Sequence, residues 1–346
     1  MGPVSVHNEW DPLEEVIVGS VEGARIPAPD LSMHAVGHPH LSSADQIPSG
    51  PFPDEVIERT AAELDELERT LTGMGVRVRR PDARDKKAVI ATPDWQSDGF
   101  YDYCPRDVLL AIGDTIIEAP MVHRSRLLEP FAYKSILVEY LRGGARWISA
   151  PKPRLLDDMY DADAPEGRRL RDHEPAFDAA NVLRFGTDIL YLVSDSGNAL
   201  GARWLQAALG DRYTVHACEG LYPGIHVDSA ITPLRPGLLL LNPVQVSEKR
   251  LPAFLRDWDR VWAPPMADLP LADHHLPCSE WVGMNSLVVA PGKVILDDRQ
   301  HELIRVLEQH GVEVVRQRLT HARTLSGAFH CTTLDVRRTG TLQTYR

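Results

Sequence analysis

The sequence contains little cysteine. Only four of its 346 residues are cysteines, and they lie far apart without a metal-binding spacing: Cys104, Cys218, Cys278 and Cys331. Few, scattered cysteines do not form the disulfide framework of a small secreted domain. Because the N-terminal residues also lack the basic and apolar regions of a signal peptide, we expect reduced thiols and a cytoplasmic protein.

Long apolar runs and an excess of positive charge are also missing. No stretch approaches the ~20 apolar residues that a membrane-spanning helix needs. Lys and Arg total 37, whereas Asp and Glu total 49, which leaves a net charge of −12. A surface this acidic repels phosphate backbones and anionic lipids, so we expect neither nucleic acid nor a membrane as a partner.

The sequence does contain a repeated unit in which a helix is followed by a break and a strand. Residues 54–73 place apolar side chains at helical spacing, and residues 76–80 alternate as a short strand. The same order recurs in four further segments, at residues 127–149, 200–215, 251–262 and 301–315. Residues 20–53, rich in Pro, Gly, Ser and His, are predicted to form one long loop.

A second unit, an apolar hairpin with a glycine turn, alternates with the first. Its five copies are residues 108–119, 182–193, 231–241, 286–297 and 334–345. Alternation of the two units predicts a ββαβ module, hence the α/β class. One such module cannot bury its own apolar face, so the copies must pack together, most simply as a closed ring within a single domain of residues 1–346.

Polar residues occupy the same place in each repeat, immediately before the hairpin. They are Asp107, Asp178, His226 with Asp228, Asn285 and Cys331. Modules related by rotation would bring all of these residues to one cavity on the ring axis. Each also has a structural explanation, since Asp178 could cap a turn and His226 could be a core histidine. Their recurrence at one repeat position favours a site.

This set of residues suits thiolate attack on a cationic carbon. Cys with His and Asp is an arrangement for nucleophilic catalysis. Additional carboxylates are unfavourable for an acyl substrate but match the planar, charged guanidinium group. The loop histidines His34, His38 and His40 have no carboxylate or thiolate at a fixed spacing, so we expect no metal.

Several motifs resemble the amidinotransferase family. They are residues 5–13 (SVHNEWDPL), 103–107 (YCPRD), 150–153 (APKP), 177–181 (FDAAN), 226–228 (HVD), 283–285 (GMN) and 329–331 (FHC). The resemblance spans essentially the whole chain. It implies a five-bladed α/β propeller with pseudo-fivefold symmetry, amidino transfer from L-arginine to an acceptor amine with release of L-ornithine, and no cofactor.

The resemblance also implies roles for individual residues. Cys331 would be the nucleophile that forms a covalent amidino-cysteine, His226 the general acid and base, and Asp178 the residue that orients His226. Substrate binding would involve Asp107, Asp228, Ser279, Gln245 and Asn285, with the first two holding the guanidinium. Gln245 replaces the family's carboxylate-binding arginine, for which Lys249 or Arg250 could compensate, and Ser326-Gly327-Ala328 interrupts a glycine run.

The acceptor is less defined than the donor. The resemblance is strongest to the inosamine-phosphate branch, which serves antibiotic biosynthesis, so we expect an aminocyclitol phosphate such as scyllo-inosamine 4-phosphate. Glycine or another primary amine, a guanidine hydrolase of the same fold, and an arginine-binding protein without turnover are the alternatives. The expected partners are therefore small molecules, and a homodimer stays open.

Overall fold

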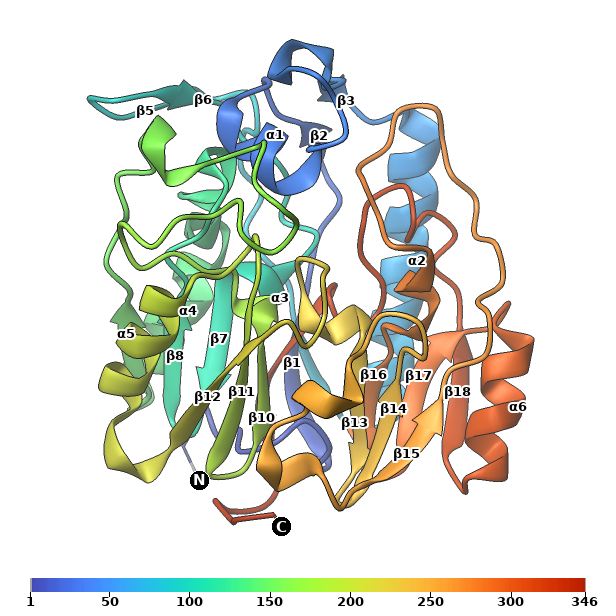
Figure 1. The fold of residues 1–346 in the computed structure, drawn as a ribbon. Coiled ribbons are helices and arrows are strands. Elements are labelled where there is room, and N and C mark those ends of the chain that lie inside the picture. Colours follow the sequence, from blue (N-terminus) through green and yellow to red (C-terminus); the bar gives the residue numbers. More distant parts are fainter. Residues whose placement is uncertain (1, 346) are drawn as a thin grey trace.

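The computed structural model describes residues 2–345 and confirms a mixed α/β architecture of repeated modules (Figure 1). Within these residues five sheets, the blades of the propeller, have three strands each. In every blade the first two strands pair antiparallel and the third lies parallel to the second. This is the pairing that a ββαβ module requires.

Four of the blades follow the chain in order. The first is β7 (Leu109–Ile112), β8 (Thr115–Glu118) and β9 (Arg146–Ser149), and the second is β10 (Val182–Phe185), β11 (Asp188–Val193) and β12 (Thr214–Glu219). The third is β13 (Ile231–Arg235), β14 (Leu238–Leu241) and β15 (Asp259–Trp262). The fourth is β16 (Leu287–Ala290), β17 (Lys293–Asp297) and β18 (Glu313–Gln317).

The fifth blade joins the two ends of the chain and corrects one prediction. Strand β19 (Thr333–Arg338) pairs with β1 (Leu13–Val18), which pairs in turn with β4 (Arg77–Arg79). The predicted hairpin at residues 334–345 is therefore wrong. After β19 the chain turns away, because the backbone N–H of Thr339 bonds to Pro12 and residue Thr344 pairs with Gly186.

Helices connect the second and third strands in most blades. They are α2 (Asp54–Gly73), α4 (Lys134–Arg142), α5 (Ala199–Leu209) and α6 (His301–Gln309), and Figure 1 shows α5 and α6 on opposite outer sides. Helix α2 buries Val56, Leu64, Leu67 and Leu71 on one face, as its periodicity predicts. The helix expected at residues 127–141 begins only at Lys134, after a 3-10 segment that contains Pro130.

Two other local predictions are wrong. Residues 251–258 form only the 3-10 turn Ala253–Leu255, because the N–H groups of Leu255 and Arg256 bond to carbonyls three residues earlier instead of four. Residues 20–53 contain α1 (Leu31–Gly37) and the pair β2 (Arg25–Ile26) and β3 (Gly50–Pro51). Helix α1 starts at Asp30, whose side chain accepts a hydrogen bond from the Met33 N–H.

Small elements complete the chain. These are α3 (Pro105–Val108) and the pair β5 (Ile90–Ala91) and β6 (Gln96–Ser97). None of the helices within residues 2–345 is both long enough and apolar enough to cross a membrane. In Figure 1 the two termini lie at one end of the molecule and α1 at the other.

Candidate active site

Seven of the eight predicted site residues line one cavity of about 460 Å³. They are Asp107, Asp178, His226, Gln245, Ser279, Asn285 and Cys331. The eighth, Asp228, contacts the Cys331 thiol directly. The segments that carry the polar residues are short turns that enter the first strand of a blade, so the repeat positions them all alike.

His226 lies between two carboxylates. Its Nε2 is 3.0 Å from Asp178 Oδ2, and its Nδ1 is 3.7 Å from Asp107 Oδ1. The backbone N–H of Val122 donates to the other oxygen of Asp178, at 3.3 Å, and so fixes this carboxylate. Burial by itself would lower the pKa of His226, but Asp107 and Asp178 raise it to about 9. The imidazole is therefore cationic at neutral pH.

The Cys331 thiol is buried and points at a carboxylate. Its Sγ donates to Asp228 Oδ2 at 3.4 Å. The neighbouring Cys104 thiol, burial and the Asp228 charge together hold the pKa of Cys331 well above its ordinary value. At neutral pH Cys331 is therefore a thiol rather than a thiolate. A cation bound beside it would favour its ionisation.

The backbone around Cys331 is held by Asn285. The Asn285 Oδ1 accepts the backbone N–H groups of His330, at 3.0 Å, and Cys331, at 3.1 Å. Gly327 lies so close that an added Cβ would be 2.8 Å from Cys104 Sγ and 3.1 Å from Cys331 Cβ. The interrupted glycine run therefore keeps its glycine at the position where close approach requires it.

Two buried carboxylate oxygens in the site have no hydrogen-bond partner among the described residues, although one of them faces His226 Nδ1 at 3.7 Å. Asp107 Oδ1 and Asp228 Oδ1 accept no hydrogen bond there, whereas the second oxygen of each is occupied. Asp107 Oδ2 accepts from Arg126 at 2.7 Å, and Asp228 Oδ2 from His330 at 2.8 Å. Unpaired buried acceptors are costly, and a cationic donor such as a guanidinium would satisfy both.

The predicted carboxylate-binding residues have weaker support. Ser279 Oγ accepts from the Trp281 N–H, and Gln245 Oε1 accepts from Asn242 Nδ2 at 3.0 Å. Lys249 and Arg250 are exposed and lie outside the cavity lining. The cavity therefore presents no substitute for an arginine at position 245 from this segment.

Sequence reasoning missed Arg126 and His330. Arg126 is buried, pairs with Glu129 as well as Asp107, and lies over the rings of Phe100 and Tyr101. Its local sequence offers only the nearby Glu129 as a partner, whereas Asp107 and the two aromatic rings come from another segment. His330 stands in the Phe-His-Cys motif beside the nucleophile, which was the available signal.

Comparison with known proteins identifies the family. Inosamine-phosphate amidinotransferase 1 of Streptomyces glaucescens is 60% identical over 347 residues and covers both chains completely. The chain belongs to the amidinotransferase family. No family model matches it. The solved inosamine-phosphate amidinotransferase of Streptomyces griseus superposes with a TM-score of 0.98 at 59% identity, covering 100% of this chain and 99% of the other.

A more distant relative is also an amidinotransferase by name. The L-arginine:L-lysine amidinotransferase of Pseudomonas savastanoi pv. phaseolicola is 38% identical over 357 residues, covering 99% of this chain and 96% of its own. The resemblance read from the motifs is thereby confirmed, together with the class of enzyme, a transferase. The five-bladed propeller is likewise supported by the Streptomyces griseus structure.

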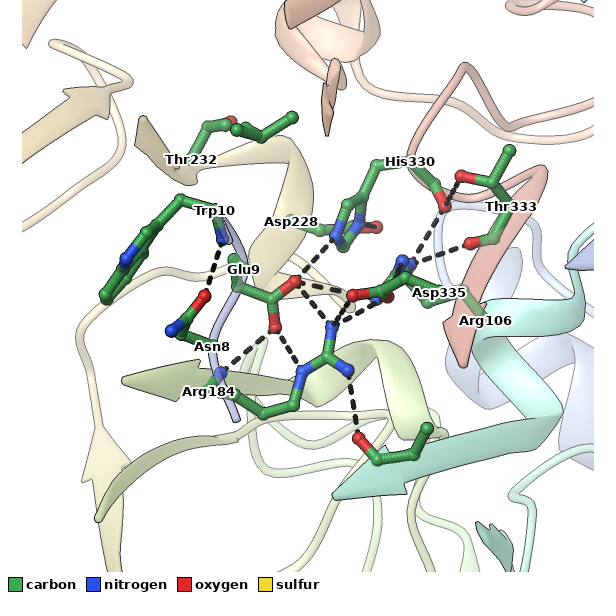
Figure 2. A network of polar contacts seen from close by, with 12 residues as sticks. Asn8, Glu9, Trp10, Arg106, Arg184, Asp228, Thr232, His330, Thr333 and Asp335 are labelled. Carbon is green, nitrogen blue, oxygen red and sulfur yellow. Dashed lines mark hydrogen bonds and ion pairs between the residues drawn. The ribbon is translucent and has the colours of Figure 1, made fainter. Parts of the chain in front are cut away.

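This amidinotransferase carries a buried ionic network around Glu9, next to His330 (Figure 2). Glu9 receives two hydrogen bonds from the Arg184 guanidinium, each of 2.7 Å, and Arg184 also donates to Asp335. Arg106 joins through Asp335 at 2.6 Å and through the backbone carbonyl of His330 at 3.0 Å. The N-terminal segment, three blades and the nucleophile loop therefore meet in one set of ion pairs.

Proposed function

We propose that this enzyme transfers the amidino group of L-arginine to an aminocyclitol phosphate, such as scyllo-inosamine 4-phosphate, by way of an amidino-Cys331 intermediate. The observation that carries the proposal is the pair of unpartnered oxygens, Asp107 Oδ1 and Asp228 Oδ1, beside a buried thiol. The relatives named above support the acceptor. In this proposal residues 1–346 act as a single domain without a metal or organic cofactor.

The first half-reaction forms a carbon–sulfur bond. Asp107 and Asp228 bind the guanidinium, and its positive charge favours ionisation of the adjacent thiol. The Cys331 thiolate attacks the guanidinium carbon while the cationic His226 donates a proton to the arginine Nε. The carbon–Nε bond breaks and ornithine leaves. The thiol proton passes to solvent, the ornithine amine gains its proton from His226, and a cationic amidino group stays on sulfur.

The second half-reaction reverses these roles. The acceptor amine takes the place of ornithine and attacks the amidino carbon, and the neutral His226 removes its proton. The carbon–sulfur bond breaks and the guanidino product leaves. His226 keeps the amine proton, and the Cys331 thiolate takes a proton from solvent, which restores the starting state. Asp178 stabilises the imidazolium each time it forms and keeps its ring in place.

The basic residues of the cavity wall suggest where an acceptor phosphate binds. Besides His226, the wall contains His38, His123 and Arg126, and Arg126 is already paired with two carboxylates. His38 is only 5% exposed, and His123 Nδ1 is buried without a partner among the described residues. These two imidazoles are therefore the available donors for a phosphate on the acceptor.

Mass spectrometry of the intact protein tests the covalent route. Incubation with arginine alone should release one equivalent of ornithine and add one amidino group to the peptide that contains Cys331. Cys331→Ala should abolish both, whereas Cys104→Ala should retain them, because Cys104 lies outside the cavity lining. An adduct on another residue, or ornithine release only when the acceptor is present, would refute the intermediate.

Acceptor identity needs a separate measurement. Arginine-dependent guanidino product should form with scyllo-inosamine 4-phosphate far faster than with glycine or lysine. Citrulline formed in the absence of any amine would instead reveal a hydrolase.

A further inference from the structure

His330, the residue before the nucleophile, bridges two carboxylates. Its Nδ1 is 2.8 Å from Asp228 Oδ2 and its Nε2 is 3.4 Å from Glu9 Oε2 (Figure 2). A neutral imidazole has one N–H and would direct a lone pair at one of these oxygens. An imidazolium could donate to both oxygens.

Both flanks of His330 are fixed. Glu9 is held by the paired hydrogen bonds from Arg184, and the backbone carbonyl of His330 accepts from Arg106 Nε at 3.0 Å. The backbone N–H of His330 donates to Asn285 Oδ1. His330 is 7% exposed, and so has little freedom to move. The ring therefore transmits the geometry of the ionic network to Asp228.

The contact determines which oxygen of Asp228 remains available. Oδ2 is occupied by His330 and the Cys331 thiol, and Oδ1 is left without a partner among the described residues. Burial alone would raise the pKa of Asp228, but the hydrogen bond and charge of His330 bring it below its ordinary value. The carboxylate thus stays ionised beside a thiol that must also ionise.

We propose that His330 is a positioning residue for amidino transfer. It holds Asp228 through Oδ2 so that Oδ1 faces the guanidinium, and its charge offsets the repulsion between Asp228 and the Cys331 thiolate. The groups that face the ring are Asp228 and Glu9. The Cys331 thiol shares Asp228 Oδ2 with the ring, and Arg106, Arg184 and Asp335 lie around Glu9. The inference rests on the proposed function, in which Asp228 binds the donor.

The first test compares two neutral replacements of His330. The amide nitrogen of His330→Asn lies near the position of Nδ1 and can keep the bond to Asp228, whereas His330→Ala keeps neither. We expect kcat/KM for arginine to fall about tenfold to a hundredfold in His330→Ala, the loss of a charge-assisted bond, and less in His330→Asn. The pH at which iodoacetamide begins to alkylate Cys331 should rise in both variants, because a nearby cation is lost.

A matched control variant and a double-mutant cycle separate a positioning role of His330 from an effect on folding. His216→Asn removes another imidazole bonded to a carboxylate, Asp188 at 2.7 Å, outside the cavity lining, and should leave both readouts unchanged. In an Asp228→Asn background, His330→Asn should have little further effect on kcat/KM, since its partner is already neutral. Additive losses, or values within twofold of wild type in both His330 variants, would overturn the proposal.

The wild type supplies a test that needs no variant. Neutron diffraction should locate hydrogen on both ring nitrogens of His330 at neutral pH, and a singly protonated ring would overturn the proposal even if the variants fail to fold. Different results would refute the proposed function and the positioning role of His330. A wild type that forms no adduct with arginine refutes the function, and with it this role. Adduct formation in His330→Ala at the wild-type rate refutes the role alone.

Discussion

At the scale of single residues, Asp107 and Asp228 each have one carboxylate oxygen bound within the fold and one without a hydrogen-bond partner among the described residues. Asp107 gives Oδ2 to Arg126 and Asp228 gives Oδ2 to His330, so that each presents Oδ1 to the cavity. Their positions before the hairpins were readable from the sequence. Their buried partners were not, because Arg126 and His330 become neighbours of these carboxylates only on folding.

Asp107→Asn should lower the pH above which the first half-reaction slows. His226 must be cationic to protonate ornithine, and its pKa of about 9 keeps it so up to that pH. A raised pKa means that the cationic form is present below it and is lost as pH rises through it. Asp107 is the leading cause that raises this pKa, so its neutralisation should lower the limit by about one to three pH units.

The pH profile of ornithine release in single turnovers measures this effect. Asp94→Asn removes an exposed carboxylate paired with Arg154 and serves as the control with an unchanged limit. An alkaline limb that stays in place in Asp107→Asn would show that His226 does not set it.

Gln245→Arg should sharpen recognition of the donor's carboxylate. The neutral amide lines the cavity and is bonded to Asn242, so it offers no charge to an α-carboxylate. Arginine should gain up to ~1.5–3 kcal/mol of binding if the new pair is shielded from water, whereas agmatine, which lacks the carboxylate, should gain nothing.

The ratio of kcat/KM for arginine to that for agmatine is the measurement. Lys249→Gln is the matched control, since Lys249 is exposed outside the cavity lining and its loss should leave the ratio unchanged. A ratio that falls in Lys249→Gln and does not respond to Gln245→Arg would place carboxylate recognition on Lys249.

At the scale of elements, strand β19 serves both stability and the site. It follows the nucleophile directly and carries Asp335, which accepts from Arg106, Arg184 and Arg338. The apolar alternation of residues 334–338 predicted a strand there. The strand with which it pairs was predicted wrongly. The backbone edge of a strand can pair with many other strands, and local sequence favours the strand that is nearest in the chain.

Asp335→Asn should destabilise the protein strongly. Removing this charge leaves three buried guanidinium groups with fewer counter-charges, and breaking a buried pair costs ~3–5 kcal/mol. Chemical denaturation gives the free energy of unfolding. Asp298→Asn, from an exposed pair with Arg318, should cost less than ~1 kcal/mol. Equal losses in the two variants would mean that the network contributes no more than a surface ion pair.

At the scale of the whole molecule, the blade built from β1, β4 and β19 connects the start of the chain to its end. Ile17 in β1 is fully buried and its backbone pairs with both neighbouring strands. The site lies where loops from all five blades converge. Residues as distant in the chain as Asp107 and Cys331 line the same cavity. Weakening strand β1 should therefore destabilise the whole molecule.

Ile17→Ala should lower the free energy of unfolding by ~2–5 kcal/mol and shift one cooperative transition. Tryptophan fluorescence and backbone circular dichroism should report the same midpoint. Leu141→Ala, on a side chain 50% exposed in α4, should change it little. Two separated transitions would indicate that the fifth blade unfolds independently of the others.

The sequence alone determined the repeat, the order of most strands within the blades and the repeat position at which the polar residues lie. Periodicity and the place of each polar residue before its hairpin depend only on local spacing, which is written in the chain. The tertiary structure decided what no local spacing contains. It joined β19 to β1, left one oxygen free on each of Asp107 and Asp228, and put His330 between Asp228 and Glu9. These contacts join residues as far apart in the chain as Leu13 and Arg338, and only packing brings such residues together and fixes their hydrogen bonds.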